Sequence, residues 1–204
     1  TAFDLDGDGR KELIMGNTYG GTWIYSSEGD SIGRAGGSGH AGGVAVACAD
    51  VDGDGQGEIA VGDKLGKIWL QKIGKKSGKV GAWWSPPRDT NIYDTGSDIT
   101  AVAMGDMHGD GKLATVVASK NFLLYLFDSQ RQPVWHVNLG DVCLDIDVAD
   151  VTGDGRAEII GGCEDGTVKV VDGHGKVIAW YRAPAAVRSV RACELDGKPD
   201  TKEI

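Results

Sequence analysis

Short apolar stretches separated by acidic, glycine-rich turns recur along the whole chain. The clearest copy opens with residues 142–149, where apolar residues alternate with Asp145 and Asp147, a pattern typical of a half-buried β-strand. Three more strand-like stretches follow at 159–163, 167–171 and 177–182. The Asp165-Gly166 pair between two of them is a hairpin signal, so the stretches are predicted to pair as consecutive antiparallel strands. Four such strands correspond to one blade of a β-propeller.

The same order of strands can be followed through the rest of the chain, which indicates a repeat protein. Repeats with a period of about 20 to 50 residues are typical of solenoids, propellers and arrays. We therefore predict an all-β fold, a β-propeller of four-stranded antiparallel blades, with about four blade-equivalents in a single domain or propeller segment spanning residues 1–204. The predicted repeats lie near residues 1–43, 44–97, 98–141 and 142–186.

Two arrangements of the chain ends are compatible with this pattern. Residues 187–193 have the pattern of a first strand and are predicted to pair with residues 13–16, so that residues 187–204 complete the first blade. Such closure would remove free sheet edges. The alternative is that these repeats are part of a ring of seven or eight blades. The chain opens inside a repeat and lacks an initiating Met, so it is expected to be a piece of a longer protein.

The second repeat departs most from the others. Residues 79–83 match residues 176–180 around a shared tryptophan, so they are predicted to form the fourth strand, and residues 86–97 are predicted to be an insertion after it. An insertion there would stand on the rim opposite the acidic loops, where irregular loops often carry function. We predict that Trp84, Arg88 and Tyr93 bind a partner, either a protein or a carbohydrate.

An acidic loop follows the first strand of each repeat. In its two best copies, residues 4–12 and 50–58, carboxylates stand at positions 1, 3, 5 and 9 and glycines at positions 4 and 6. Weaker copies are residues 106–114, 150–158 and 194–203. Carboxylates placed so closely repel one another unless a hard cation lies among them, and Ca²⁺ takes about six to eight oxygen ligands. The loops therefore predict calcium as the cofactor.

The EF-hand is the main alternative for such a loop, and the residues at position 12 argue against it. An EF-hand needs a bidentate Glu there, with helices on both sides. This chain has Met15, Val61, Val117 and Gly161 at that position, inside short apolar stretches that are predicted to be strands.

The acidic loop, an apolar strand such as Ile59-Ala60-Val61-Gly62 and a later Asp-Gly turn together resemble the FG-GAP/VCBS repeat family. The calcium-loop blades of integrin α-subunit propellers look alike, and the resemblance covers nearly all of the chain. It implies a β-propeller with Ca²⁺ on one rim, used for adhesion, ligand binding or scaffolding, in an extracellular or cell-surface location. Some polysaccharide lyases also resemble this pattern, so the propeller of a polysaccharide-degrading enzyme, or a lectin, is the alternative.

The same resemblance implies the metal ligands, and the loops differ in how completely they supply them. The side-chain ligands would be Asp4, Asp6, Asp8, Glu12, Asp50, Asp52, Asp54, Glu58, Asp150, Thr152, Asp154 and Glu158. The backbone-carbonyl ligands would be Arg10, Gln56 and Arg156. The third loop keeps only Asp106 and Asp110, because His108 and Ala114 replace two ligands, so a weak or empty site is expected there. The irregular last loop is expected to be empty.

Composition narrows the classes of function. The formal net charge of −9 argues against a nucleic-acid partner, which needs clustered Lys and Arg. No apolar stretch is long enough to insert into a membrane, and the chain carries no signal peptide. Of 204 residues, 33 are Gly and only 5 are Pro, which fits a turn-rich fold rather than a disordered chain.

No catalytic residue is predicted, which favours a binding module over an enzyme and leaves the polysaccharide-degrading alternative open. The four histidines are scattered over different repeats, and the clear carboxylate clusters are all assigned to the cation. The four cysteines lack metal-site spacing and are predicted to be small buried residues; a disulfide stays open because sequence alone cannot pair them.

Overall fold

The structure is a computed structural model, which describes residues 1–5, 7–17, 21–36, 42–72 and 91–193. All regular elements in these residues are strands. The first sheet contains β1 (Ala2–Phe3), β2 (Glu12–Asn17), β3 (Gly21–Tyr25) and β4 (Ser31–Ala35). The second contains β5 (Gly43–Ala49), β6 (Glu58–Asp63), β7 (Lys67–Lys72) and β8 (Asn91–Asp94). The third contains β9 (Ile99–Gly105), β10 (Ala114–Ser119), β11 (Leu123–Phe127) and β12 (Pro133–Asn138). The fourth contains β13 (Cys143–Ala149), β14 (Glu158–Cys163), β15 (Thr167–Val171) and β16 (Val177–Arg182).

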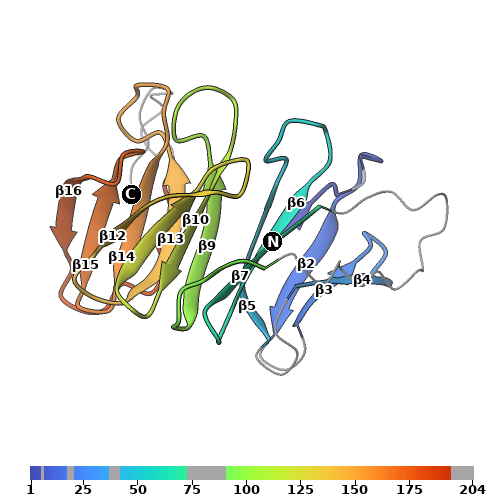
Figure 1. Cartoon of the computed structure of the whole chain (residues 1–204), viewed down its shortest axis with the longest axis horizontal. Helices are drawn as coiled ribbons and strands as arrows, with labels where there is room; N and C mark the ends of the chain where they lie inside the picture. Colours follow the sequence, from blue (N-terminus) through green and yellow to red (C-terminus); the bar gives the residue numbers. More distant parts are fainter. Residues whose placement is uncertain (6, 18–20, 37–41, 73–90, 194–204) are drawn as a thin grey trace. The chain divides into compact units, whose positions relative to one another are not determined.

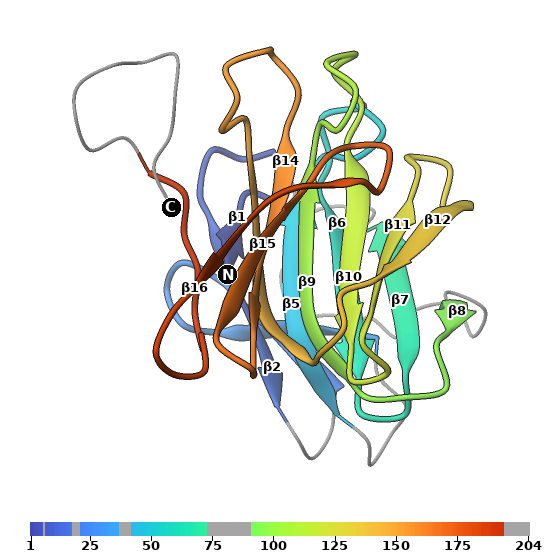
Figure 2. The same cartoon turned by 90° about the vertical axis from the view of Figure 1, so that its left-hand side faces the viewer.

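Each sheet is an up-and-down meander, in which strands that follow one another in sequence are hydrogen-bonded neighbours (Figures 1 and 2). The pairs are antiparallel, with residue partners such as Ile14 to Ile24 and Ile160 to Val170. The predicted all-β architecture of four-stranded antiparallel sheets is therefore confirmed. Each sheet lies within one predicted repeat, apart from Gly43 at the start of β5, which precedes its predicted boundary by one residue.

The chain divides into two compact units, Thr1–Ile99 and Thr100–Ile204, and each is described by itself. In the first unit, Ile59 and Val61 of the second sheet join Ile14 and Ile24 of the first sheet in one buried cluster. Side chains alternate between the two faces of a strand, and Ile14 is one residue out of step with the repeat positions of Ile59 and Val61. One face of the second sheet therefore packs on the opposite face of the first, and the core forms between the two stacked sheets.

The second unit repeats this packing. Val116 and Leu126 of the third sheet are buried with Ile159 and Val171 of the fourth. Trp135 of β12 packs against the same cluster, and its indole Nε1–H donates to the Gly173 carbonyl of the fourth sheet at 3.0 Å. Trp135 therefore packs between the third and fourth sheets, whereas Trp180, at the same position of the next repeat, is 64% exposed.

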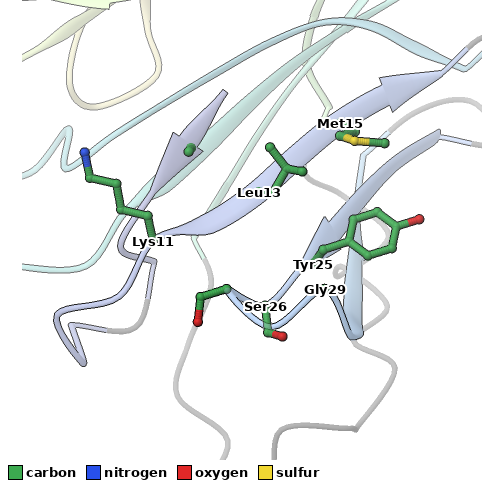
Figure 3. A pocket seen from close by; sticks show the side chains of 8 residues that line it. Lys11, Leu13, Met15, Tyr25, Ser26 and Gly29 are labelled. Carbon is green, nitrogen blue, oxygen red and sulfur yellow. The ribbon is translucent and has the colours of Figure 1, made fainter.

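The central strand of a sheet is buried only where a neighbouring sheet covers it. Ile59 and Val61 in β6 are fully buried, whereas their counterparts Leu13 and Met15 in β2 are 44% and 46% exposed. Leu13 and Met15 line a pocket beside Tyr25 (Figure 3). The same position in the repeat therefore has a different environment in each sheet, and the burial is decided by the packing of sheets rather than by the strand sequence.

The fourth strand of the second sheet differs from the prediction. Its place beside β7 is taken by β8, with Tyr93 paired to Ile68, whereas the predicted strand at 79–83 lies outside the described residues. Residues 86–97 are therefore not an insertion after the blade, because part of them forms β8. The long connection is 73–90, between β7 and β8.

The described end of the predicted insertion lies on the predicted rim. The Thr95 backbone N–H donates to the carbonyl of Gly66, in the turn between β6 and β7, at 2.8 Å. That turn is at the end of the sheet opposite the acidic loop, because Glu58 and Lys72 pair at the other end of the same two strands. Residues 86–90 lie outside the described residues, so the rim prediction is not tested for them.

The strand beside β2 also differs from the expectation. Residues 1–3 occupy that place, with Ala2 paired to Leu13 and Phe3 paired to Glu12. Residues 187–192 form no strand, although Val187 lies beside β14, where its backbone N–H donates to the Cys163 carbonyl at 3.0 Å. Residues 194–204 lie outside the described residues.

All four cysteines are free thiols. Cys143 and Cys163 are buried and are direct partners across β13 and β14, while Cys193 is exposed and Cys48 is half-buried. The prediction of buried cysteines therefore holds for Cys143 and Cys163 and fails for Cys193. A hydrogen bond with Cys143 lowers the pKa of Cys163 to about 7.

We predict that Gly105→Ala destabilises the second unit. A Cβ on Gly105 would lie 2.2 Å from Cγ1 of Val148. Overpacking of this kind costs about 1–3 kcal/mol. Urea unfolding of the single variant would measure the loss in free energy of unfolding.

The double variant Gly105→Ala/Val148→Ala provides the control. Removing the valine methyl groups relieves the clash, so the double variant should lose less stability than the sum of the two single losses. Strictly additive losses would contradict a contact between these two residues.

Candidate metal centre

A hydrogen-bonded turn forms the frame of each of the four acidic loops that start at residues 4, 50, 106 and 150; the fifth, 194–203, lies outside the described residues. In the second loop, Asp50 Oδ1 accepts the backbone N–H of Gly53 at 2.8 Å and of Asp54 at 3.1 Å, and Oδ2 accepts that of Gly55 at 2.8 Å. Gly53 and Gly55 have φ of 76° and 82°, a left-handed conformation that glycine adopts without steric cost. The first carboxylate and the two glycines of the motif are therefore explained by the turn itself.

The other three loops have the same frame. Asp4, Asp106 and Asp150 each accept backbone N–H groups from positions 4, 5 and 6 of their own loops. The carboxylate at position 5 accepts the N–H of position 7, as Asp8 does from Arg10 at 2.8 Å. Even the third loop keeps this geometry, so the turn does not require the complete set of ligands.

The glutamate at position 9 closes the base of three loops. One carboxylate oxygen of Glu12, Glu58 and Glu158 accepts the backbone N–H of position 2, at 2.8, 2.8 and 3.0 Å. These glutamates are buried, with 7%, 2% and 4% of their surface exposed. In the third loop the same position is Ala114, which supplies no oxygen. The oxygens that a cation could share are the second oxygen of the glutamate, the carboxylates at positions 3 and 5, and Oδ2 of position 1, which in the second loop accepts the N–H of Gly55 alone.

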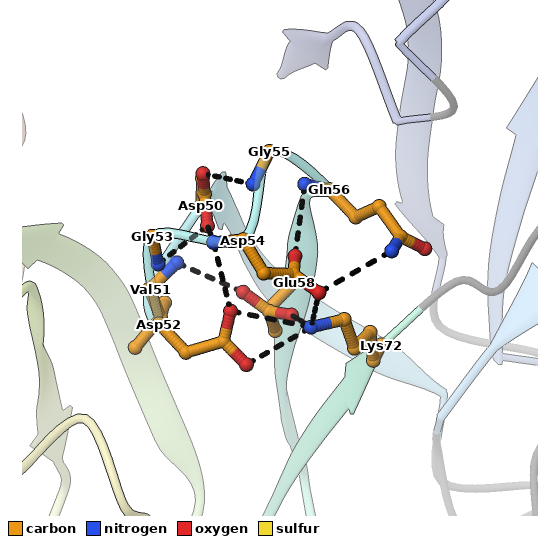
Figure 4. Close-up of polar contacts among 9 residues, drawn as sticks. All are labelled: Asp50, Val51, Asp52, Gly53, Asp54, Gly55, Gln56, Glu58 and Lys72. Atoms are coloured by element: carbon orange, nitrogen blue, oxygen red, sulfur yellow. Dashed lines mark hydrogen bonds and ion pairs between the residues drawn. The ribbon is translucent and has the colours of Figure 1, made fainter.

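The second loop brings three carboxylates together (Figure 4). Ligand oxygens of Asp50, Asp52 and Glu58 lie within 4.8 Å of one another, close enough to hold one metal ion. Glu58 Oε1 is buried and has no hydrogen-bond partner among the described residues. Burial raises the pKa of Glu58, since a charged carboxylate is less stable away from water.

A lysine that is not part of the loop enters this cluster. The Lys72 ammonium lies 2.9 Å from Asp52 Oδ2 and 3.5 Å from Glu58 Oε1, and it also pairs with Asp54 (Figure 4). The bond between Lys72 and Asp54 raises the pKa of the lysine and lowers the pKa of the aspartate. Sequence analysis missed Lys72 because it lies on β7, a strand away from the acidic motif.

The fourth loop satisfies its glutamate internally. Glu158 Oε2 accepts the backbone N–H of Thr152 at 3.2 Å, and the Thr152 hydroxyl donates to Oε1 at 3.3 Å. Thr152 was predicted to replace a carboxylate ligand, and here its hydroxyl is turned toward the glutamate. Asp150 and Asp154 keep their roles in the turn.

The first loop contains Asp4, Asp8 and Glu12 in the expected frame, while Asp6 lies outside the described residues. Arg10, predicted to offer its carbonyl, extends its side chain to Glu28 at 2.5 Å in an exposed ion pair. Gln56 and Arg156 occupy the same position in their loops, and their backbone N–H groups donate to Asp54 and Asp154. Whether the three carbonyls bind a metal stays a prediction.

The predicted partner-binding residues are only partly described. Tyr93 lies half-buried on β8, and Trp84 and Arg88 lie outside the described residues. The structure therefore does not test whether the three form one surface. No helix in the described part of the chain is long and apolar enough to cross a membrane.

Comparison with known proteins supports the repeat and the fold. Residues 4–61 match the FG-GAP-like repeat, which confirms the resemblance over that segment. A search of curated proteins finds no match. Many solved structures, by contrast, share the fold.

Three solved structures illustrate the likeness. The computationally designed Ika8 protein is 14% identical and has a TM-score of 0.64 over 96% of this chain and 52% of its own. The V. cholerae biofilm matrix protein Bap1 is 20% identical, with a TM-score of 0.63 over 94% of this chain and 29% of its own. The Neurospora crassa Pan2 WD40 domain is 12% identical, with a TM-score of 0.60 over 91% of this chain and 50% of its own.

These likenesses confirm the predicted β-propeller fold. At identities of 20% or less they bear on the fold alone. The chain spans about half of Ika8 and of the Pan2 domain, and less than a third of Bap1.

We predict that Asp106→Ala destabilises the third loop without any contribution from metal. Its carboxylate accepts backbone N–H groups from His108, Gly109, Asp110 and Gly111. Losing bonds to a charged acceptor costs about 1.5–3 kcal/mol. Denaturant unfolding in EDTA would measure the loss in free energy of unfolding. Asp110→Ala is the control and should cost less, because among the described N–H groups of the loop the Asp110 carboxylate accepts only that of Lys112.

The difference between the parent and Asp106→Ala should depend on pH. Partial burial acts to raise the pKa of Asp106, but the backbone N–H groups outweigh it, so the pKa lies below the ordinary 3.8. A lowered pKa gives stability that is present above the unfolded-state value and is lost as the pH falls through the folded-state value. An unchanged difference in unfolding free energy down to acidic pH would contradict this role.

Proposed function

We propose that the chain is a calcium-binding β-propeller that acts as an adhesion, ligand-binding or scaffolding module. The observation that carries the proposal is the cluster of Asp50, Asp52 and Glu58, whose ligand oxygens converge within 4.8 Å. Glu58 contributes a buried oxygen without a hydrogen-bond partner in the described chain. A buried carboxylate oxygen without a hydrogen bond is costly, and the Lys72 ammonium, 3.5 Å from it, leaves room for a cation to bind it more closely.

The donors of the second loop fit calcium. They are carboxylate oxygens, which a hard cation prefers, and no imidazole or thiol lies in the motif. Asp50, Asp52, Asp54 and Glu58 would hold the ion, which when bound would supply positive charge to join the loop to the end of β6. The first loop has the same residue types, with Asp4, Asp6, Asp8 and Glu12.

The other two loops fit less well. The third has His108 and Ala114 at ligand positions, and in the fourth the Thr152 hydroxyl already pairs with Glu158. We therefore propose binding at the first two loops, a weaker site at the fourth, and little or no binding at Asp106 and Asp110.

An extracellular or cell-surface setting suits such sites. Extracellular calcium modules have dissociation constants of about 10⁻⁴ to 10⁻³ M, so solvent-exposed loops of this kind would fill only where calcium is abundant. The fold likeness to a biofilm matrix protein is consistent with a structural role outside the cell. The partner would be a protein or a carbohydrate bound by Trp84, Arg88 and Tyr93.

We predict that calcium raises the melting temperature. Binding to the native state alone stabilises by about 2.7 kcal/mol at a hundredfold excess of calcium over Kd. Differential scanning calorimetry in EDTA and in millimolar CaCl₂ would measure the shift. Asp8→Ala should reduce it by removing a ligand of the first loop, while Asp110→Ala should leave it nearly unchanged. Identical melting temperatures of the parent in EDTA and in calcium would refute calcium binding.

The partner surface can be tested separately. Replacing residues 86–96 as a block would remove β8, so substitutions of individual side chains outside β8 are required. We predict that Trp84→Ala/Arg88→Ala loses binding on a glycan array, or to an isolated protein partner, while its melting temperature is maintained. Trp180→Ala is the matched control, because Trp180 is an exposed tryptophan on β16. Equal losses in both variants would contradict a specific role for Trp84 and Arg88.

A further inference from the structure

Lys72 stands directly opposite the base of the second acidic loop. It is the last residue of β7, and its Cα partner across the strands is Glu58. Its ammonium reaches Asp52, Asp54 and Glu58, so one positive charge lies among the side chains assigned to the metal (Figure 4). A lysine ammonium is a compact point charge on a flexible stem, and it can therefore take the place of a small cation.

The other repeats have a different residue type at this position. Ser26, Asp128 and Asp172 stand there, and each accepts backbone N–H groups of the turn that follows. Ser26 Oγ accepts from Glu28 and Asp30, Asp128 Oδ1 from Gln130 and Gln132, and Asp172 Oδ1 from His174 and Lys176. Lys72 has no acceptor with which to form such a turn, and its side chain is directed to the acidic loop instead. The contrast makes Lys72 a feature of the second loop rather than of the repeat.

Glu58 shows that the lysine does not fully satisfy the cluster. Its Oε1 lies 3.5 Å from the Lys72 nitrogen and has no hydrogen bond with any described residue. Calcium binds oxygens at about 2.3–2.6 Å, closer than this ion pair. Asp50, Asp52, Asp54 and Glu58 together carry more negative charge than one ammonium neutralises, so the loop retains attraction for a divalent cation.

From these contacts we infer that the Lys72 ammonium is the resident counterion of the second loop, which neutralises the cluster in the absence of metal and is displaced when Ca²⁺ binds. The inference deepens the proposed function and rests on it for the calcium step. It predicts that the second loop holds its conformation without metal, and that calcium binds there more weakly than the ligands alone would allow. The lysine thus sets the calcium concentration at which the second loop responds.

The experiment compares Lys72→Ser, which introduces the residue of the first repeat, with Lys64→Ser. Lys64 is exposed in the turn between β6 and β7, so the control makes the same change in charge away from the loop. Calorimetric titration with CaCl₂ and melting in EDTA are measured for both, and Glu58→Gln identifies which binding event belongs to the second loop. Lys72→Ser should melt at a lower temperature than Lys64→Ser in EDTA, because it lacks the counterion of the loop. It should also bind calcium at this loop about tenfold more tightly. A tenfold gain is expected when a competitor that occupies the site about nine-tenths of the time is removed.

The outcomes separate the two proposals. Equal melting in EDTA, or equal calcium affinity, in Lys72→Ser and Lys64→Ser overturns the resident-counterion inference while leaving calcium binding at the other loops intact. Absence of any calcium-dependent shift in the parent and in both variants instead removes the proposed calcium function. If Lys72→Ser does not fold in EDTA, Lys72→Gln removes the charge while keeping part of the aliphatic stem and a hydrogen-bond donor, and it must show the same tighter binding for the inference to hold.

Discussion

The acidic loops depend first on hydrogen bonds between a carboxylate and the backbone, and only then on any cation. In the four described loops the first aspartate accepts the N–H groups of the three residues that turn the chain, and two left-handed glycines make this turn sterically accessible. In three of them the buried glutamate at position 9 then ties the start of the loop to the next strand. The proposed metal would depend on the carboxylates at positions 3 and 5 and on the second oxygen of the glutamate.

The acidic motif therefore combines a turn and a candidate metal site in one stretch of nine residues. The third loop shows that the turn forms without the glutamate, because it keeps the bonds around Asp106 and has Ala114 at that position. An Asp-Gly-rich motif is therefore good evidence for this turn and weaker evidence for a metal. The decisive residues are the ones whose oxygens the backbone does not use.

The periodicity of apolar residues was sufficient to predict the sheets, and it failed where tertiary pairing overrides local pattern. The predicted strands at 159–163 and 167–171 agree with β14 and β15 within a residue, because strand alternation and Asp-Gly turns are local signals. The fourth strand of the second sheet was placed at 79–83 on a match around Trp83, yet residues 91–94 pair with β7. Which segment pairs with β7 depends on the contacts that β7 offers, and the sequence of the segment itself does not reveal those contacts.

Lys72 was missed for a related reason. The metal loop was analysed as a contiguous motif, whereas the register between β6 and β7 brings Lys72 to Glu58. The available signal was comparative, since Lys72 stands where the other repeats have Ser26, Asp128 and Asp172. A single substitution such as Lys72 is less conspicuous in a sequence than an insertion. It nevertheless changes the electrostatics of the acidic loop directly, because it places a positive charge among the carboxylates.

The glutamate at position 9 also explains why the second, third and fourth loops would differ in their need for the proposed metal. A buried carboxylate oxygen is costly to leave without a partner, and these loops meet this cost in different ways. The fourth loop supplies the Thr152 hydroxyl, the second supplies the Lys72 ammonium at a longer distance, and the third has replaced the glutamate with Ala114. The Thr152 hydroxyl gives the glutamate oxygen a hydrogen bond and adds no charge. The Lys72 ammonium neutralises charge but leaves the glutamate oxygen without a hydrogen bond. Of these three, the second loop is therefore the one in which the proposed calcium would gain most by displacing a group that is already present.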